Sequence, residues 1–236
     1  MKLLSINSDA KTIKSNNLGE YLTAILYLAP AKTAGYQVCP NATNGCKSSC
    51  LFTAGRGAFS NVAQSRINKT KFFFKNRKAF FIQLDKEVFA FNKKCKRLGL
   101  KPAIRLNGTS DICWALINLE LFNKYNNITF YDYTKNQKYM TTYMNGNLPK
   151  NYYLTFSRSE YNWSFCENVL KVGYTVASVF NSIPLNYKNW PVHNGDSHDL
   201  RFLDPPAHII GLKAKGRAKK DKTGFVISND VLKINK

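Results

Sequence analysis

The stretch Pro102-Ala-Ile-Arg-Leu-Asn-Gly-Thr-Ser-Asp111 carries the pattern that decides the fold. Its first five residues are mostly apolar and predict a buried strand, and residues 107–111 predict a polar turn at the carboxyl end of that strand. A helical pattern follows over 114–125. This order of strand, polar turn and helix is typical of a βαβ unit in a parallel sheet.

The same order recurs along the chain. Further strands are predicted at 21–29, 128–133, 152–156, 175–180 and 208–212, and further helices at about 60–97, 137–144 and 161–171. On the first of these helices a stripe of apolar residues at spacings of three and four should face the core; it consists of Phe80, Leu84, Val88, Phe91, Cys95 and Leu98.

We therefore predict one α/β domain over residues 1–236, built as a partial or complete βα barrel. A doubly wound sheet is the alternative. It is disfavoured because the first strand is followed by no Gly-x-Gly-x-x-Gly turn, and the chain has no phosphate loop ending in Gly-Lys-Ser/Thr.

Composition narrows the partners and the compartment. The chain has 35 Lys and Arg against 14 Asp and Glu, a net charge of +21 that would attract nucleic acid or another polyanion. Scattered lysines on a solvated surface are the alternative. No apolar run reaches the roughly 18–20 residues of a membrane span, and the amino terminus is too polar for a signal peptide, so we expect no membrane contact and a cytoplasmic location.

Three of the six cysteines lie in one segment, Cys39-Pro-Asn-Ala-Thr-Asn-Gly-Cys46-Lys-Ser-Ser-Cys50. In a reducing compartment such cysteines are metal ligands or core residues rather than disulfides. The spacing of Cys46 and Cys50 predicts two sulfurs on one side of a helical turn. Structural zinc sites usually need two closely spaced pairs, and there is no second pair, so three ligands of a 4Fe-4S cluster are favoured over zinc or free thiols.

The sequence leaves several alternatives for the fourth ligand of the cluster. Cys113 follows the polar turn and Cys166 lies in a predicted helix, and each is either that ligand or a small buried residue. A non-cysteine residue and a small molecule at the open iron are the remaining choices.

A three-cysteine loop after the first strand of a βα series resembles radical S-adenosylmethionine enzymes, although their loop usually has gaps of three and two residues and this one has six and three. The resemblance implies that Asn107, Gly108, Thr109, Ser110 and Asp111 bind the amino group of S-adenosylmethionine. It also implies that Ser157, Arg158 and Glu160 face its ribose or carboxylate. Ser110 and Asp111 could instead cap the following helix.

Over most of its length the sequence is similar to a bacteriophage family known as gene product eighty-eight. The similarity rests on 24–30, the loop of 39–50 with 53–61, 105–112, 130–135, 154–157, 199–205 and 211–218. It implies a phage protein in an infected host cell and no particular reaction. Two functions follow: an enzyme with S-adenosylmethionine or a substrate at the open iron, or a nucleic-acid-binding protein with a structural or redox-sensing metal site.

Two further segments carry polar chemistry. Residues 191–199 predict a turn-rich loop, in which His193 and His198, together with His208, are potential metal ligands; Asp196, Asp199 and Arg201 make this region a second polar candidate. The basic segment 213–236 contains Lys213, Lys215, Arg217, Lys219, Lys220 and Lys222, which either bind phosphate groups or are solvated, and its Lys-rich tail is expected to be disordered.

Overall fold

The computed structural model describes residues 1–7 and 10–228. The part of the predicted basic segment after residue 228, with the tail expected to be disordered, lies outside them. The strands are β1 (Leu4–Ile6), β2 (Tyr21–Leu26), β3 (Lys101–Arg105), β4 (Thr129–Thr134), β5 (Tyr152–Ser157), β6 (Val176–Phe180), β7 (Asn186–Tyr187), β8 (Trp190–Asn194), β9 (Ile209–Lys213) and β10 (Val226–Ile227).

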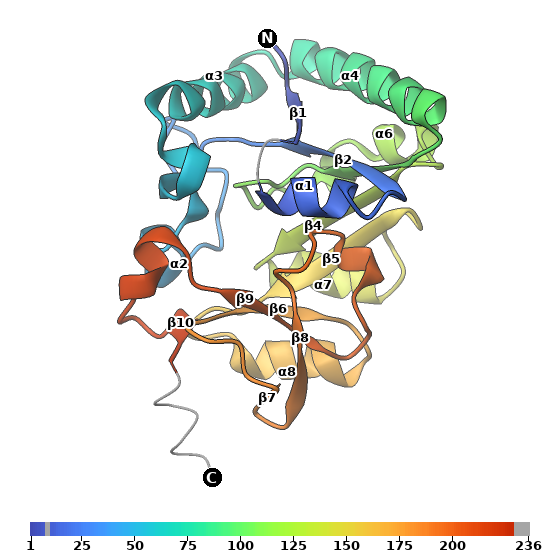
Figure 1. Cartoon of the computed structure of the whole chain (residues 1–236). Coiled ribbons are helices and arrows are strands. Elements are labelled where there is room, and N and C mark those ends of the chain that lie inside the picture. The colour runs from blue at the N-terminus through green and yellow to red at the C-terminus, as the bar shows by residue number, and fades with distance from the viewer. Residues whose placement is uncertain (8–9, 229–236) are drawn as a thin grey trace.

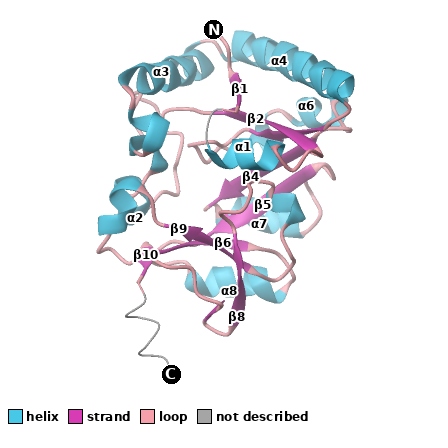
Figure 2. Ribbon diagram, in the orientation of Figure 1, coloured by secondary structure: helices cyan, strands magenta, loops and turns pink. Residues whose placement is uncertain are grey.

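The α-helices alternate with the middle strands (Figures 1 and 2). They are α1 (Ala10–Asn16), α2 (Asn44–Ser48), α3 (Ser60–Lys75), α4 (Arg77–Leu98), α5 (Trp114–Ile117), α6 (Leu119–Lys124), α7 (Gln137–Met144) and α8 (Trp163–Lys171). Short 3-10 turns are η1 (Leu51–Thr53), η2 (Gly55–Ala58), η3 (Arg201–Leu203) and η4 (Gly216–Lys220).

The strands form one sheet in the order β1-β2-β3-β4-β5-β6-β9-β8-β7, with β10 paired to β6. Its centre, from β2 to β6 and on to β9 and β8, is parallel, while β1 and β7 add antiparallel strands at the two ends. The strands from β2 to β6 follow one another without a reversal, whereas a doubly wound sheet needs a reversal point. The α/β prediction is confirmed, but the sheet is open, so a complete barrel is not formed.

The six predicted strands are all present, and β1, β7, β8 and β10 were not predicted. The segment 190–194, expected to lie in a turn-rich loop, is strand β8 because it pairs with β9. Two predicted helices are each interrupted once. Asn76 leaves the helical region (φ −136°, ψ 58°) between α3 and α4, and Asn118 does so (φ −152°, ψ 59°) between α5 and α6.

The main core lies between the sheet and the longer helices, and the predicted stripe on α4 faces it. Phe80, Leu84, Val88, Phe91 and Cys95 are buried as expected. Leu98 is 50% exposed, because it is the last residue of the helix and Gly99 then turns the chain away in a left-handed conformation. Among the described residues, no helix combines the length and apolar character needed to cross a bilayer.

The opposite face of the sheet is covered by α1 and by the chain that follows β8, both in front of the sheet in Figure 1. A small second cluster forms there, in which Leu200 packs with Ala103 and Tyr131. Arg105 of β3 also points to this side and pairs with the buried Asp199 at 3.0 Å. The sheet thus has one apolar face and one face on which charged groups are buried.

Candidate functional site

The cysteine loop, residues 39–50, lies beside the carboxyl ends of the parallel strands. Cys39 anchors its beginning: its Sγ accepts a hydrogen bond from the backbone N–H of Ala31 at 3.4 Å and contacts the carbonyl oxygen of Thr109 at 3.7 Å. One residue earlier, the carbonyl oxygen of Val38 accepts from the N–H of Asp111 at 2.8 Å. The first cysteine is therefore fixed against the turn after β3.

The other two cysteines are positioned by helix α2. Thr43 caps this helix, and its Oγ1 accepts from the N–H of Cys46 at 3.2 Å. The helix ends at Ser48, and Cys50 is extended (φ −60°, ψ 134°). The prediction that Cys46 and Cys50 share a helical turn is therefore wrong, since α2 is too short to include both.

Glu160, from the turn after β5, holds this loop in place. One carboxylate oxygen accepts from the hydroxyl of Thr43 at 2.6 Å, and the other accepts from the N–H of Gly45 at 2.9 Å. Both bonds are made to an ionised acceptor and so are stronger than neutral ones. A residue predicted to face a cofactor is here bonded to the cysteine loop itself.

The three thiols are free and lie near one another. Burial, with smaller contributions from Asp111, Cys50 and Cys46, raises the pKa of Cys39 to about 12. Burial also raises the pKa of Cys50, with Cys46 adding to the effect. The described sulfur atoms do not all lie within 4.8 Å of one another, whereas a tetrahedral zinc with bonds near 2.3 Å needs sulfurs about 3.8 Å apart.

Two cations face this group of thiols. Lys135 and Arg66 both act to lower the pKa of Cys50, against the larger effect of burial. Arg66 stacks on Tyr27, with its guanidinium carbon 4.6 Å from the ring centre. Lys135 donates to the hydroxyl of Ser157 at 2.9 Å. Lys135, which follows β4, and Arg66 of α3 therefore place positive charge near Cys50.

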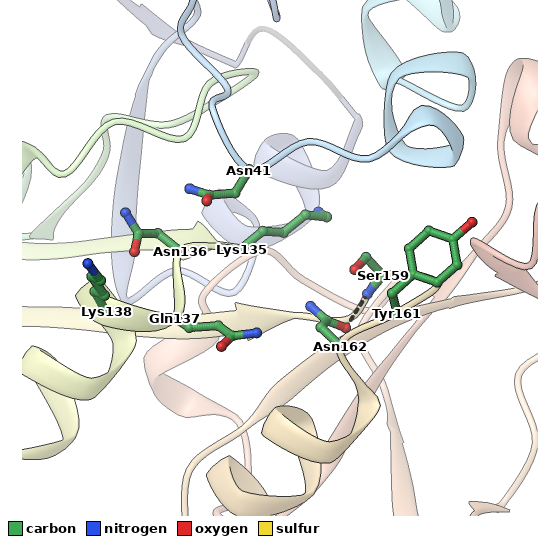
Figure 3. A pocket seen from close by; sticks show the side chains of 8 residues that line it. All are labelled: Asn41, Lys135, Asn136, Gln137, Lys138, Ser159, Tyr161 and Asn162. Carbon is green, nitrogen blue, oxygen red and sulfur yellow. Dashed lines mark hydrogen bonds between the residues drawn. The ribbon is translucent and has the colours of Figure 1, made fainter.

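A cavity of about 580 Å³ opens at the ends of β4 and β5 (Figure 3). Asn41 of the cysteine loop reaches into it opposite Lys135 and Asn136, which follow β4. Its remaining lining comes from Gln137, Lys138, Ser159, Tyr161 and Asn162. This volume falls within the usual range for small-molecule sites. None of these residues was predicted as a site residue. All except Asn41 come soon after a predicted strand, which is the signal that could have found them.

The polar groups of the predicted turn 107–111 are largely engaged in hydrogen bonds within the protein. The amide oxygen of Asn107 accepts from Ser110 Oγ, from the N–H of Ile112 and from Trp114 Nε1 at 2.8–3.0 Å. Gly108 packs so closely on β2 that a Cβ would lie 2.7 Å from the carbonyl oxygen of Leu26, and Thr109 donates to the carbonyl oxygen of Leu28.

Asp111 closes the same turn onto β4. Its carboxylate accepts from Thr134 Oγ1 at 2.7 Å and from the N–H of Lys135 at 3.0 Å, while burial raises its pKa. Helix α5 has no side-chain cap, so neither Ser110 nor Asp111 caps it. The turn instead positions Lys135 at the cavity, and direct binding of a cofactor by 107–111 stays a prediction.

Arg158 and Ser157 have similar supporting contacts. Arg158 donates to the carbonyl oxygens of Gly224 and Phe225 at 2.7 and 2.8 Å, which ties the chain before β10 to the turn after β5. Ser157 accepts from Lys135. The strand ends, the cysteine loop and the segment 221–225 are thus joined into one structure.

Comparison with protein families decides the family of the chain. The model of the family described as gene product 88 matches residues 2–229. The chain belongs to the gene product 88 family. Comparison with curated proteins gave no match. Comparison with solved structures gave none either. The family predicted from sequence is thereby confirmed, and its description names no reaction.

The two predicted alternatives for a fourth ligand differ in this gene product 88 protein. Cys166 is fully buried in α8 and contacts Asn162 Oδ1 at 3.5 Å. Cys113 is half-buried, and the amide of Asn136 approaches its Sγ at 3.6 Å. Burial raises the pKa of Cys113 to about 11. The burial of Cys166 agrees with the prediction of a small core residue. Cys113 instead lies beside Asn136, which lines the cavity.

A second, smaller cavity adjoins the cysteine loop on the gene product 88 fold. Its volume is about 380 Å³, and it is lined by Ser48, Ser49, Arg217, Lys220, Asp221, Lys222 and Thr223. The exposed basic residues come from η4 and the chain after it, so part of the predicted basic segment lies directly against α2. Ser49 Oγ lies 3.5 Å from Asp221 Oδ1 across this contact.

Proposed function

We propose that the protein binds a 4Fe-4S cluster through Cys39, Cys46 and Cys50. The observation that carries the proposal is that three free cysteines from one loop lie beside the strand ends, with Cys46 and Cys50 near enough to Cys39 to raise its pKa. A cubane cluster bonds each cysteine to a different iron, so it suits ligands that are spread more widely than those of one ion.

The surroundings of the thiols support this assignment. A cluster bound by thiolates is anionic, and the cations Lys135 and Arg66 face Cys50. Charge and hydrogen bonding around the sulfurs are the means by which proteins stabilise such clusters. Because burial raises the pKa of Cys39 and Cys50, these thiols are protonated in the metal-free protein, and binding of iron must release those protons.

We further propose that the fourth iron is open and faces the 580 Å³ cavity, where S-adenosylmethionine or a related small molecule would bind. Lys135 would bind a carboxylate, and Asn136, Ser159 and Asn162 offer hydrogen-bond donors and acceptors to polar groups. When bound, a reduced cluster supplies an electron for cleavage of the sulfonium. The residues of this chain would hold the ligand and exclude water from it, as in a radical S-adenosylmethionine-like enzyme.

The cluster is tested by anaerobic purification followed by iron and sulfide analysis. We expect about four irons and four sulfides per chain. The variants Cys39→Ala, Cys46→Ala and Cys50→Ala should each lose most of this iron. Cys95→Ala is the matched control, because Cys95 is buried on α4 within the core. Stoichiometric zinc with no sulfide would refute the cluster.

The open iron is tested separately with S-adenosylmethionine. Its addition to the reduced protein should change the electron paramagnetic resonance spectrum of the cluster and release 5′-deoxyadenosine. Lys135→Ala should weaken this spectral change in samples compared at equal iron content, since Lys135 also faces Cys50. A spectrum that S-adenosylmethionine does not alter at any concentration would reject the enzyme and leave a structural or redox-sensing cluster.

The second cavity favours one alternative function, the binding of nucleic acid through Arg217, Lys220 and Lys222. Replacing these three residues by Ala should lower the slope of log affinity for duplex DNA against log salt by about 2.7, since each phosphate contact contributes about 0.9. The matched control replaces three exposed lysines of α4, Lys86, Lys93 and Lys94. Equal effects of the two triple variants would indicate attraction by net charge alone.

A further inference from the structure

Two histidines and an aspartate come together on the charged face of the sheet, apart from the cysteine loop. His193 lies on β8, while His198 and Asp204 lie on either side of η3. One ligand atom from each lies within 4.8 Å of the other two, and His193 Nε2 is 4.0 Å from Asp204 Oδ1. The sequence predicted His193 and His198 as metal ligands, together with His208, but not Asp204, which lies beyond η3.

The carboxylate of Asp204 gives an independent indication of a ligand. Its side chain is 0% exposed, yet neither oxygen has a hydrogen-bond partner among the described residues. Arg201 Nε lies 3.2 Å from Oδ2 and provides charge, but without the geometry of a hydrogen bond. Buried carboxylates are nearly always hydrogen-bonded or coordinated to metal. Asp204 therefore has unused acceptor capacity beside two imidazoles.

We propose that His193, His198 and Asp204 bind a divalent transition-metal ion, such as Zn²⁺, with part of the coordination sphere open. Two imidazoles and one carboxylate are the protein ligands of many catalytic zinc sites and of non-haem Fe²⁺ sites. The side chain of His193 is 36% exposed, so solvent or a small ligand can reach an ion held there. This site shares no residue with the proposed cluster.

The distances fit after a small adjustment. Bonds of 2.0–2.2 Å in a tetrahedral arrangement place ligand atoms about 3.4 Å apart. The present separations are up to 4.8 Å. Side-chain rotations that move each ligand atom by about 1 Å or less would bring the three atoms to the required distance. Burial and the positive charge of Arg201 lower the pKa of both histidines, which favours the neutral imidazole that metals require.

Arg201 gives the proposal a distinctive consequence. Its guanidinium contacts the carbonyl oxygen and Nδ1 of His198 as well as Asp204, so it occupies the side of the cluster away from solvent. It positions two of the three ligands, and its charge also repels a cation. A conservative Arg201→Gln change that keeps the fold should therefore tighten metal binding, an effect that loss of a purely structural contact would not produce.

The test is titration of the full chain with Co²⁺, followed by optical absorption, in a Cys39→Ala/Cys46→Ala/Cys50→Ala background. We expect one Co²⁺ per chain, with ligand-field bands and without the intense charge transfer from sulfur. His193→Ala and His198→Ala should each weaken binding at least tenfold, and Arg201→Gln should strengthen it. His208→Ala is the control, because His208 bonds the carbonyl oxygen of Pro206 outside the cluster.

Circular dichroism of each variant separates lost folding from lost binding. The half-exposed His193 is the variant whose fold should be least affected. The proposal would be overturned if the folded Cys39→Ala/Cys46→Ala/Cys50→Ala protein did not bind Co²⁺. It would also be overturned if His193→Ala left the affinity for Co²⁺ unchanged. Neither result would affect the 4Fe-4S assignment, which is tested by iron and sulfide in the unmodified protein.

Discussion

Replacing Gly45 by Ala tests how the cysteine loop is held. Gly45 lies inside helix α2, where Ala is the better helix former by about 1 kcal/mol, so sequence reasoning alone predicts a gain in stability. The packing predicts the opposite. A Cβ on residue 45 would lie 2.6 Å from Phe225 Cβ, and still closer to Thr223 Oγ1 and Glu160 Oε1.

The magnitude follows from how little these neighbours can move. Phe225 Cβ is fixed by its backbone, and the carboxylate of Glu160 is held by Thr43 and by the N–H of Gly45. Overpacking of this kind costs about 1–3 kcal/mol, which exceeds the gain in helix propensity. We expect a net loss of up to about 2 kcal/mol, equivalent to a decrease of up to about 8 °C in melting temperature for a chain of this size.

The assay is thermal and urea unfolding of the wild-type protein and three variants. Lys47→Ala, on the exposed side of the same helix, should change the free energy of unfolding by less than about 0.5 kcal/mol. Thr223→Ala removes the hydroxyl that the new methyl group meets, so the double variant with Gly45→Ala should recover part of the loss. A higher melting temperature for Gly45→Ala would refute the packing of α2 on residues 223–225.

Three further predictions concern the two faces of the sheet. Burial raises the pKa of Asp132 to about 7, so the folded protein binds an extra proton between about pH 4 and 7 and loses stability as the pH rises through that range. Urea unfolding should show this decrease, up to about 4 kcal/mol, largely removed in Asp132→Asn. Asp199→Asn breaks the buried pair with Arg105 and should cost about 3–5 kcal/mol, whereas Glu20→Gln, at the exposed pair with Lys101, should leave stability almost unchanged in the same assay. Leu84→Ala should lose about 2–5 kcal/mol of unfolding free energy and the exposed Ile82→Ala almost none; equal losses would contradict the orientation of α4.

Local pattern was sufficient for most of the fold. Strands such as 128–133 are largely apolar, short and followed by polar turns, and the stripe on α4 has helical spacing. Each of these patterns can be recognised within a short stretch of sequence. The short strands β7 and β10 have two residues each and carry no periodicity. These two strands form by pairing with a neighbouring strand, and local sequence does not specify which strand is the neighbour.

The candidate site was predictable only in part, for the same reason. The type and spacing of the cysteines identify them as candidate ligands, and most of the cavity residues follow predicted strands. The role of Glu160 depends on contact with Gly45, which is 115 residues away in the chain. Likewise, nothing near Asp204 in the sequence indicates that its carboxylate is buried against His193 of another element. Such pairings follow from the order of the strands in the sheet.

The charged face of the sheet is difficult to explain by stability alone. Arg105, Asp199, Arg201 and Asp204 are all removed from solvent, and buried ion pairs of this kind are often no more stabilising than apolar residues of the same volume. A sheet face that served only as core would be filled like the other one, with Leu, Ile and Phe. The main core also buries an acid, Asp132, but the four charges of this face are concentrated around Asp199 and Arg201, and their desolvation cost is accounted for if the face binds something charged. Unpartnered donors of Arg105 and Arg201 are buried here as well, but the unpartnered oxygens of Asp204 are the ones that lie beside His193 and His198, in agreement with the cation proposed at that site.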